Sequence, residues 1–528
     1  MVTPVRRRPC RLRAMATETG SAPAAADPWL RLGPGVAALA TFLVHALCWD
    51  RYGVFRDELY FVECGRRLAF GYVDQPPGIP LVAGIAHAAF GTWVPGLRLF
   101  PWIASAAIVY LTGRLAVRMG AGRPGALVAS IAALASPVIL GIGHLLTMNV
   151  FEVLLVLGLV HALVTLVKGE SPRRWVGAGL LAALAVLFKY SAAIVAIALL
   201  AGLLLTPERR TLATRWLVPA AALAIVLVLP NLLWQAAYGF PFLELVANGQ
   251  RYKNAAFDVR GFTAGLVLEA GPVNAVVWVA GLAWLLVAAP GRPFRFLGIG
   301  AALYLAVLLA SRGKSYYFTS ALPVLMAAGG VAWESWLRRA PVAARRVLPA
   351  ALAVQLLLVP LAVPLLAEGA FVRWQAFLRV RPPPLERDRQ GALPQVFADM
   401  HGWQAMADAA VRAYDTLPEA EKRTAVVFGQ NYGQAAAVDV LAAGRAPPAI
   451  SRQNQYWLWG VPPGRGDPSI IIGDDREDCG GHFRERVLVE KLPSDPWVRP
   501  SEDAPSIWIC RGLTVPVSEI WPSLRLYI

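Results

Sequence analysis

The chain has 528 residues, of which 57% are hydrophobic and 16% are charged, and its formal net charge is +16. Soluble proteins carry about 25% charged residues, so this composition excludes an ordinary soluble protein and indicates a polytopic membrane protein. The positive charge does not indicate a nucleic-acid partner. The arginines gather in short runs between apolar segments, as orientation signals do, and no RNA- or DNA-binding motif accompanies them.

Residues 1–33 are basic at first and then rich in Ala, Ser and Thr, and we expect them to form a disordered cytoplasmic tail. A cleavable signal peptide is not predicted, because the first apolar run begins only after Leu32 and many more apolar runs follow. The sequence leaves open whether Met15 is the true start.

Apolar segments of about 20 residues, the length that spans a bilayer, recur through residues 34–366. Arginine-rich connections alternate with arginine-poor ones, so the positive-inside rule predicts a multi-pass protein of the plasma (inner) membrane with a cytoplasmic N-terminus. Everything after residue 367 is then extracytoplasmic. The predicted spans are 34–50, 96–117, 124–142, 149–167, 174–188, 191–206, 215–235, 272–289, 295–311, 317–337 and 347–366.

The first outer connection, residues 51–95, carries acidic residues in a shaped segment. Arg56, Asp57, Glu58 and Tyr60 stand at its start, and the segment 71–80 contains Asp74, Gln75 and a Pro-Pro pair that breaks any helix running through it. A solvated loop is the plain interpretation of such an acidic pair. The apolar neighbours instead favour a helix lying along the membrane surface beside a functional site.

Three cations stand on the predicted outer side, against the usual charge bias. Lys189 lies in a very short turn, and Arg312 and Lys314 precede a tyrosine pair that includes Tyr317. One interpretation is that they snorkel to the headgroups, with the tyrosines as interfacial belt residues. The other is that they bind the phosphate of a lipid carrier, which would lie at the same depth.

The fourth predicted span begins with polar residues. Asn149 stands near its outer end and Glu152 lies about one helical turn inside it, where an ionisable group is a candidate for function. Local pairing of Glu152 with His144 or Asn149 is the alternative, and both interpretations remain open. The long connection 236–271 mixes aromatic and charged residues, so it is either a lid over a site or a simple amphipathic connection.

The composition changes after residue 366. Residues 367–384 form a linker that ends in three prolines, and residues 385–528 are expected to form a soluble α/β domain. Segments 424–428 and 469–472 resemble buried strands, with a helix over 433–443 between them. Two polar-aromatic clusters, 431–434 and 454–460, are of the kind that stacks on sugars, although core packing explains the tryptophans better.

Two of the five cysteines, Cys479 and Cys510, lie in this domain and can pair in an oxidising compartment. No His/Cys spacing suits zinc, and neither an HExxH motif nor a Walker loop is present. Nucleotide-driven chemistry is therefore not predicted. No cofactor is predicted either, although a divalent metal stays open.

Four segments together resemble the GT-C membrane glycosyltransferases, and in particular the bacterial family-39 proteins related to protein O-mannosyltransferases and lipid A aminoarabinose transferases. The resemblance covers about residues 34–340, and residues 431–433 and 454–460 look like the C-terminal domain of the same branch. The segments are Phe55–Tyr60, Gly71–Pro77, Leu187–Tyr190 and Gly313–Tyr317.

The resemblance implies a polyprenyl-phosphate sugar donor, an active site on the outer face, and inversion at the sugar carbon. It maps the catalytic base to Asp57. Two departures disfavour aminoarabinose as the sugar: Gln75 stands where that branch often has lysine, and Thr147-Met148-Asn149 stands where it often has a second acidic residue. Neither departure affects the general reaction.

The chemistry is consistent with these residues. A sugar on a lipid phosphate is already activated, so the enzyme needs a carboxylate to take the acceptor's proton and cations to hold the departing phosphate. The predicted partners are this donor, membrane lipids and a cell-envelope acceptor, with no nucleic acid. The predicted site comprises catalytic Asp57 and Glu58; phosphate-binding Lys189, Arg312, Lys314 and Tyr317; and the substrate-site candidates Arg56, Tyr60, Asp74, Gln75, Asn149 and Glu152.

The alternative class is a transporter or lipid flippase. Such a protein would need charges near the bilayer midplane and paired broken helices, whereas the charges here gather at the predicted outer interface and the two halves show no repeat. A receptor or scaffold is a third class, and it would leave Asp57 and Lys314 dispensable.

Overall fold

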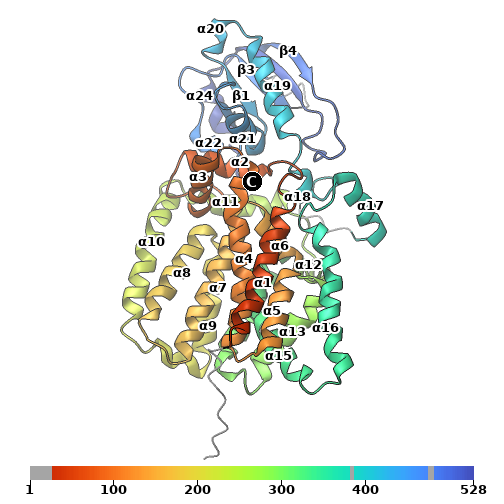
Figure 1. Ribbon diagram of the computed structural model, residues 1–528. Helices are drawn as coiled ribbons and strands as arrows, with labels where there is room; N and C mark the ends of the chain where they lie inside the picture. The colour runs from red at the N-terminus through yellow and green to blue at the C-terminus, as the bar shows by residue number, and fades with distance from the viewer. Residues whose placement is uncertain (1–26, 381–385, 474–480) are drawn as a thin grey trace, which may run out of the picture.

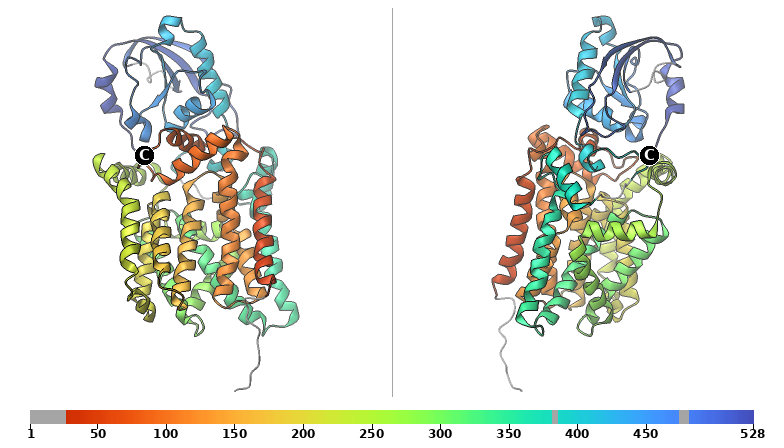
Figure 2. Two further views of the ribbon diagram at one scale, coloured as in Figure 1. Left: turned by 60° about the vertical axis from the view of Figure 1, so that its left-hand side comes forward. Right: turned by 90° about the vertical axis from the view of Figure 1, so that its right-hand side faces the viewer.

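The computed structural model describes residues 27–380, 386–473 and 481–528. A bundle of roughly parallel and antiparallel helices forms one end of the molecule, and a small α/β domain forms the other (Figure 1; Figure 2). The helices α2 (Arg56–Arg66) and α3 (Gly78–Phe90) lie between them. The predicted fold class, a polytopic helical membrane protein with a C-terminal α/β domain, is confirmed. The predicted pairing residue Cys479, most of the predicted tail and the end of the predicted linker lie outside the described residues.

Each predicted span coincides with a helix or a helix pair of the bundle. Five helices are long and apolar enough to cross a membrane by themselves, and two bent pairs raise this to seven among the described residues. The other apolar helices are 10–17 residues long. The bundle helices are α1 (Trp29–Ala46), α4 (Val94–Arg118), α5 (Arg123–Leu134), α6 (Pro137–His144), α7 (Met148–Val167), α8 (Arg174–Phe188), α9 (Ser191–Leu204), α10 (Leu217–Ala237), α13 (Pro272–Val287), α14 (Arg295–Ala310), α15 (Leu322–Leu337) and α16 (Val342–Gln355).

Small residues let these helices approach closely. At Gly281 of α13, an added Cβ would lie 1.9 Å from the carbonyl oxygen of Leu325 on α15, so no larger residue fits there. Close backbone contact of this kind is how helices gain packing energy in a bilayer, where lipid tails are as apolar as the side chains.

The connection 236–271, which the sequence left open as a lid or a simple amphipathic connection, is largely helical. It contains α11 (Pro241–Asn248), the π-helical turn η3 (Gly249–Lys253) and α12 (Val259–Ala270). The chain bends by 100° between α12 and α13. Gly271 lies at this bend with a φ of +97°, which favours glycine, and Pro272 follows it. Residue 254 then pairs with Glu386 in an isolated bridge, which brings this connection to the C-terminal domain.

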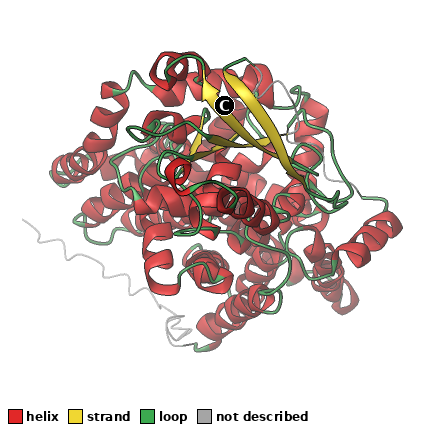
Figure 3. Ribbon diagram, turned by 90° about the horizontal axis from the view of Figure 1, so that it is seen from above, coloured by secondary structure: helices red, strands yellow, loops and turns green. Residues whose placement is uncertain are grey.

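The C-terminal domain contains a five-stranded sheet with the order β2-β1-β3-β5-β4. The strands β1 and β3 are parallel neighbours and β5 pairs antiparallel to β3, while α19 and α21 supply most of the helical packing. Figure 3, which looks down on this domain, shows the strands lying over the helices. The elements are β1 (Val426–Gly429), β2 (Ala449–Ser451), β3 (Ser469–Gly473), β4 (Phe483–Lys491), β5 (Ser506–Leu513), α17 (Glu368–Leu378), α18 (Gln395–Ala398), α19 (Trp403–Asp415), α20 (Glu419–Lys422), α21 (Tyr432–Leu441), α22 (Asn454–Trp459) and α24 (Val517–Ile520).

One hydrophobic core joins this domain to α2 and α3. It contains Val427 of β1 and Ala436 of α21 together with Tyr60 of α2 and Ile79 of α3. Most side chains of α2 are buried between the bundle and the C-terminal domain, so the apolar residues that favoured a surface helix in the sequence are part of this shared core. Cys510 of β5 is buried and disulfide-bonded.

Candidate active site

The N-terminal turn of α2 presents Asp57 at the seam between the bundle and the C-terminal domain. Phe55 precedes the helix in an extended conformation, and the first turn carries Asp57 and Glu58, where the helix dipole favours carboxylates. The side chain of Asp57 keeps 29% of its surface exposed. Its Oδ1 accepts hydrogen bonds from the hydroxyl of Tyr432 (2.8 Å) and from Nε of Arg56 (3.4 Å).

Glu58 points away from Asp57 into the protein. Its side chain is fully buried, and Arg98 donates to both carboxylate oxygens, each at 2.8 Å. The backbone N–H groups of Phe55 and Leu146 donate to the same carboxylate at 2.8 Å. With four donors around it and no solvent, Glu58 is arranged as a structural residue, which corrects the expectation that it shares the catalytic position.

Asp74 lies close to Asp57 on the connection between α2 and α3. Burial raises the pKa of Asp74 to about 6, the hydrogen bond from Tyr60 (2.9 Å) opposes this shift, and Asp57 and Lys253 contribute smaller opposite effects. The neighbouring Gln75 is not part of this group, contrary to expectation. Its side chain is fully buried and its Nε2 lies 3.6 Å from the sulfur of Cys64.

Lys189 ends α8 and meets the start of α7. Its ammonium donates to Oδ1 of Asn149 (2.8 Å), pairs with Glu152 (3.3 Å) and lies 4.2 Å from the ring centroid of Tyr317. Four predicted residues from distant parts of the sequence are thus brought together. Glu152 also accepts a hydrogen bond from Ser191 (2.9 Å), so its local partners are Lys189 and Ser191 rather than His144.

The two predicted cations between α14 and α15, Arg312 and Lys314, differ in their burial. Arg312 is exposed and has a left-handed backbone conformation (φ +55°). It was predicted to bind the phosphate, but among the described residues it contacts none of the other predicted site residues. Lys314 is half-buried directly before the 3₁₀ turn η5 (Ser315–Ser320), and its ammonium makes no hydrogen bond or ion pair within the described ranges. Burial raises the pKa of Tyr316, the second residue of η5, and Tyr317, Glu269 and Asp57 raise it further.

Lys253 is a further cation near these residues, and the sequence did not predict it as part of the site. Burial lowers the pKa of its ammonium, and Glu386, Arg56, Asp57 and Lys314 all lie close enough to alter it. Lys253 pairs with Glu386 at 3.7 Å. The sequence gives no signal that distinguishes this lysine, because its place depends on the pairing of its connection with residues 386 and 387, far away in the chain.

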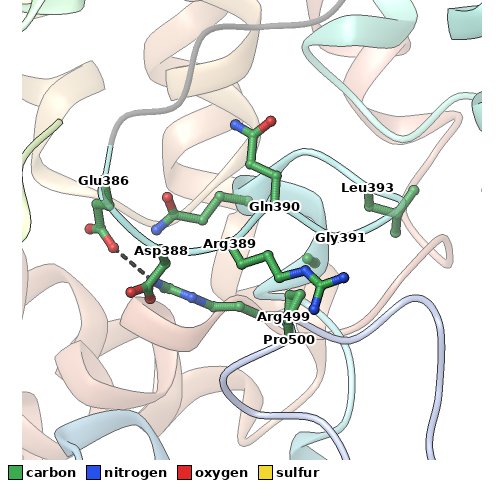
Figure 4. Close-up of a pocket in the computed structure, with 10 residues that line it drawn as sticks. Glu386, Asp388, Arg389, Gln390, Gly391, Leu393, Arg499 and Pro500 are labelled. Carbon is green, nitrogen blue, oxygen red and sulfur yellow. Dashed lines mark hydrogen bonds and ion pairs between the residues drawn. The ribbon is translucent and has the colours of Figure 1, made fainter.

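A network of ion pairs in the C-terminal domain connects Glu386, the partner of Lys253, to Arg56 beside Asp57. Arg499 pairs with Glu386 (2.8 Å), with Asp388 and with Asp399 (3.5 Å), beside a small pocket lined by residues of the C-terminal domain (Figure 4). Asp399 in turn lies 3.8 Å from the guanidinium of Arg56. Burial alone would raise the pKa of Glu386, but Lys253, Arg56 and Arg499 lower it to about 2, so this carboxylate is ionised at neutral pH.

The structure thus links one partly exposed carboxylate, Asp57, to Lys253 through the ion pairs of Arg56, Asp399, Arg499 and Glu386. It gathers Lys189, Asn149, Glu152 and Tyr317 into a second group. Among residues 27–380, 386–473 and 481–528, no three His, Cys, Asp or Glu side chains form a group suited to a metal ion. Chemically, the arrangement can accept a proton at Asp57 and stabilise an anion at the lysines.

Residues 74–234 match the model of the dolichyl-phosphate-mannose-protein mannosyltransferase family. A comparison with curated proteins finds no match. Among solved structures, ArnT from Cupriavidus metallidurans in the apo state is similar, with a TM-score of 0.59 and 16% identity, over 95% of this chain and 99% of that protein. The same protein bound to undecaprenyl phosphate gives a TM-score of 0.57 and 16% identity over 93% and 99% of the two chains.

An oligosaccharyltransferase from Archaeoglobus fulgidus, tethered to an acceptor peptide, is also similar. Its TM-score is 0.51 at 14% identity, and the match covers 80% of this chain and 64% of that protein. At these identities the likeness concerns the fold. The chain therefore has the fold of the GT-C membrane glycosyltransferases, and its segment 74–234 matches their mannosyltransferase family.

Proposed function

We propose that the chain transfers a sugar from a polyprenyl-phosphate donor to a hydroxyl of a cell-envelope acceptor, on the extracytoplasmic face of the membrane and with inversion at the sugar carbon. One observation carries this proposal: a partly exposed carboxylate, Asp57, lies at one end of the apolar bundle (Figure 1) in a continuous chain of ion pairs that reaches Lys253 through Arg56, Asp399, Arg499 and Glu386. The structure of ArnT with undecaprenyl phosphate supports a lipid phosphate as the donor group.

In the proposed reaction, Asp57 takes the proton of the acceptor hydroxyl while the hydroxyl oxygen forms a bond to the anomeric carbon. The bond from that carbon to the phosphate oxygen breaks, and the polyprenyl phosphate leaves with the electron pair. Lys314, Lys253 and Lys189 would stabilise the negative charge on this phosphate. Glu58 is assigned a structural role in holding α2.

The test is sugar transfer by the purified chain. Undecaprenyl-phosphate mannose with a labelled sugar is the first probe, because the family match concerns mannosyltransferases, and a cell-envelope fraction from a deletion strain serves as acceptor. Labelled product that depends on the protein supports the proposal. If polyprenyl-phosphate mannose, glucose and aminoarabinose all give no product while the protein is folded, the proposal is wrong.

Lys314 is predicted to bind the donor through its charge. We expect Lys314→Ala to weaken binding of undecaprenyl phosphate by roughly 10- to 100-fold, the range for a hydrogen bond to a charged group, and Lys314→Arg to weaken it less. Binding is measured by thermophoresis in detergent. The matched control is Arg312→Ala, which removes an exposed cation two residues away. If Lys314→Ala and Lys314→Arg both keep wild-type turnover, Lys314 is only an interfacial anchor.

The proposed orientation predicts which residues an impermeant thiol reagent reaches in intact cells. Ser311→Cys and Asp415→Cys should react, and Arg209→Cys should not. All three positions are exposed in the structure, so burial does not explain a difference in labelling. The predicted alternation of arginine-rich connections places residues 311 and 415 outside and residue 209 in the cytoplasm. Labelling at residue 209 would invert the orientation and remove the extracytoplasmic site.

A further inference from the structure

Tyr432, the first residue of α21, reaches from the C-terminal domain into the proposed active site. Its hydroxyl donates to Oδ1 of Asp57 at 2.8 Å. Asn431 sets the start of α21, since its side chain accepts a hydrogen bond from the N–H of Gln434. The tyrosine is therefore held at a fixed helix end rather than on a loop.

The ring of Tyr432 is fixed on both sides. It lies 4.7 Å from the ring of Tyr60, and the guanidinium of Arg56 lies 5.2 Å from its centroid. The stem of Arg56 rests on Gly433, where an added Cβ would lie 2.5 Å from Cγ of that arginine. Tyr432 keeps only 6% of its surface exposed, and burial raises its pKa well above the usual range, so it is a donor at neutral pH.

The two oxygens of Asp57 are therefore unequal. Oδ1 accepts from both Tyr432 and Arg56, whereas Oδ2 accepts no hydrogen bond from the described residues. An oxygen that already accepts two hydrogen bonds is a poorer base than a free one. The free oxygen belongs to a side chain with 29% of its surface exposed, so a substrate can reach it.

We propose that Tyr432 is a positioning residue of the C-terminal domain that holds Oδ1 of Asp57 and so presents Oδ2 to the acceptor hydroxyl. This inference rests on the proposed function. It gives the C-terminal domain a part in the reaction, because the hydrogen bond from Tyr432 (2.8 Å) is shorter than the one from Arg56 (3.4 Å), the other donor to Oδ1.

The test compares two variants that each remove one buried tyrosine hydroxyl from a carboxylate at the seam. Tyr432→Phe removes the donor to Asp57. The control Tyr456→Phe removes a matched donor, whose hydroxyl lies 2.9 Å from Asp439 of α21 and whose side chain is also buried. Both variants keep the ring and its packing, so a loss of interface stability affects both.

We expect Tyr432→Phe to lower kcat about 10- to 100-fold, the worth of a hydrogen bond to an ionised group, while KM for undecaprenyl-phosphate mannose and binding of undecaprenyl phosphate stay unchanged. Tyr456→Phe should keep kcat. In an Asp57→Asn background, Tyr432→Phe should cost almost nothing further, because the hydroxyl acts through the carboxylate.

Each other result overturns the inference in a recognisable way. If both variants lose kcat equally, or if Tyr432→Phe melts well below Tyr456→Phe, the hydroxyl only stabilises the interface. If the losses of Tyr432→Phe and Asp57→Asn multiply, the tyrosine acts independently of Asp57. If the folded wild-type chain transfers no sugar, the proposed function fails, and this inference fails with it.

Discussion

Asp57→Asn is expected to reduce turnover by roughly 10²- to 10⁴-fold, the usual worth of a positioned general base. The substitution keeps the size of the side chain and an oxygen that can accept from Tyr432, but it removes the basicity. Binding of undecaprenyl phosphate should stay near normal, because Lys253 and Lys314 remain in place. Steady-state transfer from a labelled donor, together with a separate binding titration, measures the two effects independently.

A normal turnover in Asp57→Asn would exclude Asp57 as the base. The next candidate would then be Asp74, which lies close by and whose pKa of about 6 suits a base at neutral pH. Glu58 and Glu152 follow less naturally, since each is already paired with a cation in a buried position. A variant that loses donor binding as well as turnover would instead place Asp57 in substrate binding.

Breaking the ion pair of Glu58 and Arg98 should destabilise the protein more than any change at Asp57. Both side chains are fully buried, so removing one partner leaves an uncompensated charge, which typically costs about 3–5 kcal/mol. We expect this loss in Arg98→Met and in Glu58→Gln, measured by denaturant unfolding in detergent. Glu58→Gln should lose activity in proportion to the folded fraction.

The double variant provides the control for this pair. When both partners are neutral, no isolated charge remains, so its loss of stability should be smaller than the sum of the two single losses. Folded Glu58→Gln protein with greatly reduced turnover would contradict the structural role and return Glu58 to the chemistry.

The membrane architecture could be predicted because it depends on local composition. A run of apolar residues near bilayer length forms a helix wherever it stands, since backbone groups in lipid must bond within the segment. All the predicted spans therefore fall on helices, including α7 and α10. The sequence also showed that the acidic segment near Asp57 and the Pro-Pro break are not a span.

Individual pairings could not be predicted, because they join residues far apart in the chain. The sequence does not distinguish the adjacent carboxylates Asp57 and Glu58. In the structure, Glu58 is buried against Arg98 of α4, whereas Asp57 stays partly exposed. The sequence does not distinguish Arg312 from Lys314 either, but in the structure Arg312 is exposed in a left-handed conformation while Lys314 is half-buried.

The sequence by itself determined the apolar helices, the separate α/β domain and the segments that carry the charged residues, because hydropathy, proline and charge act over a few neighbouring residues. Only the tertiary structure decided which charges meet. Docking of the C-terminal domain on α2 places Tyr432 on Asp57, and the pairing of residues 254 and 386 brings in Lys253. These contacts depend on a shared core that spans both parts of the chain, and no local pattern encodes it.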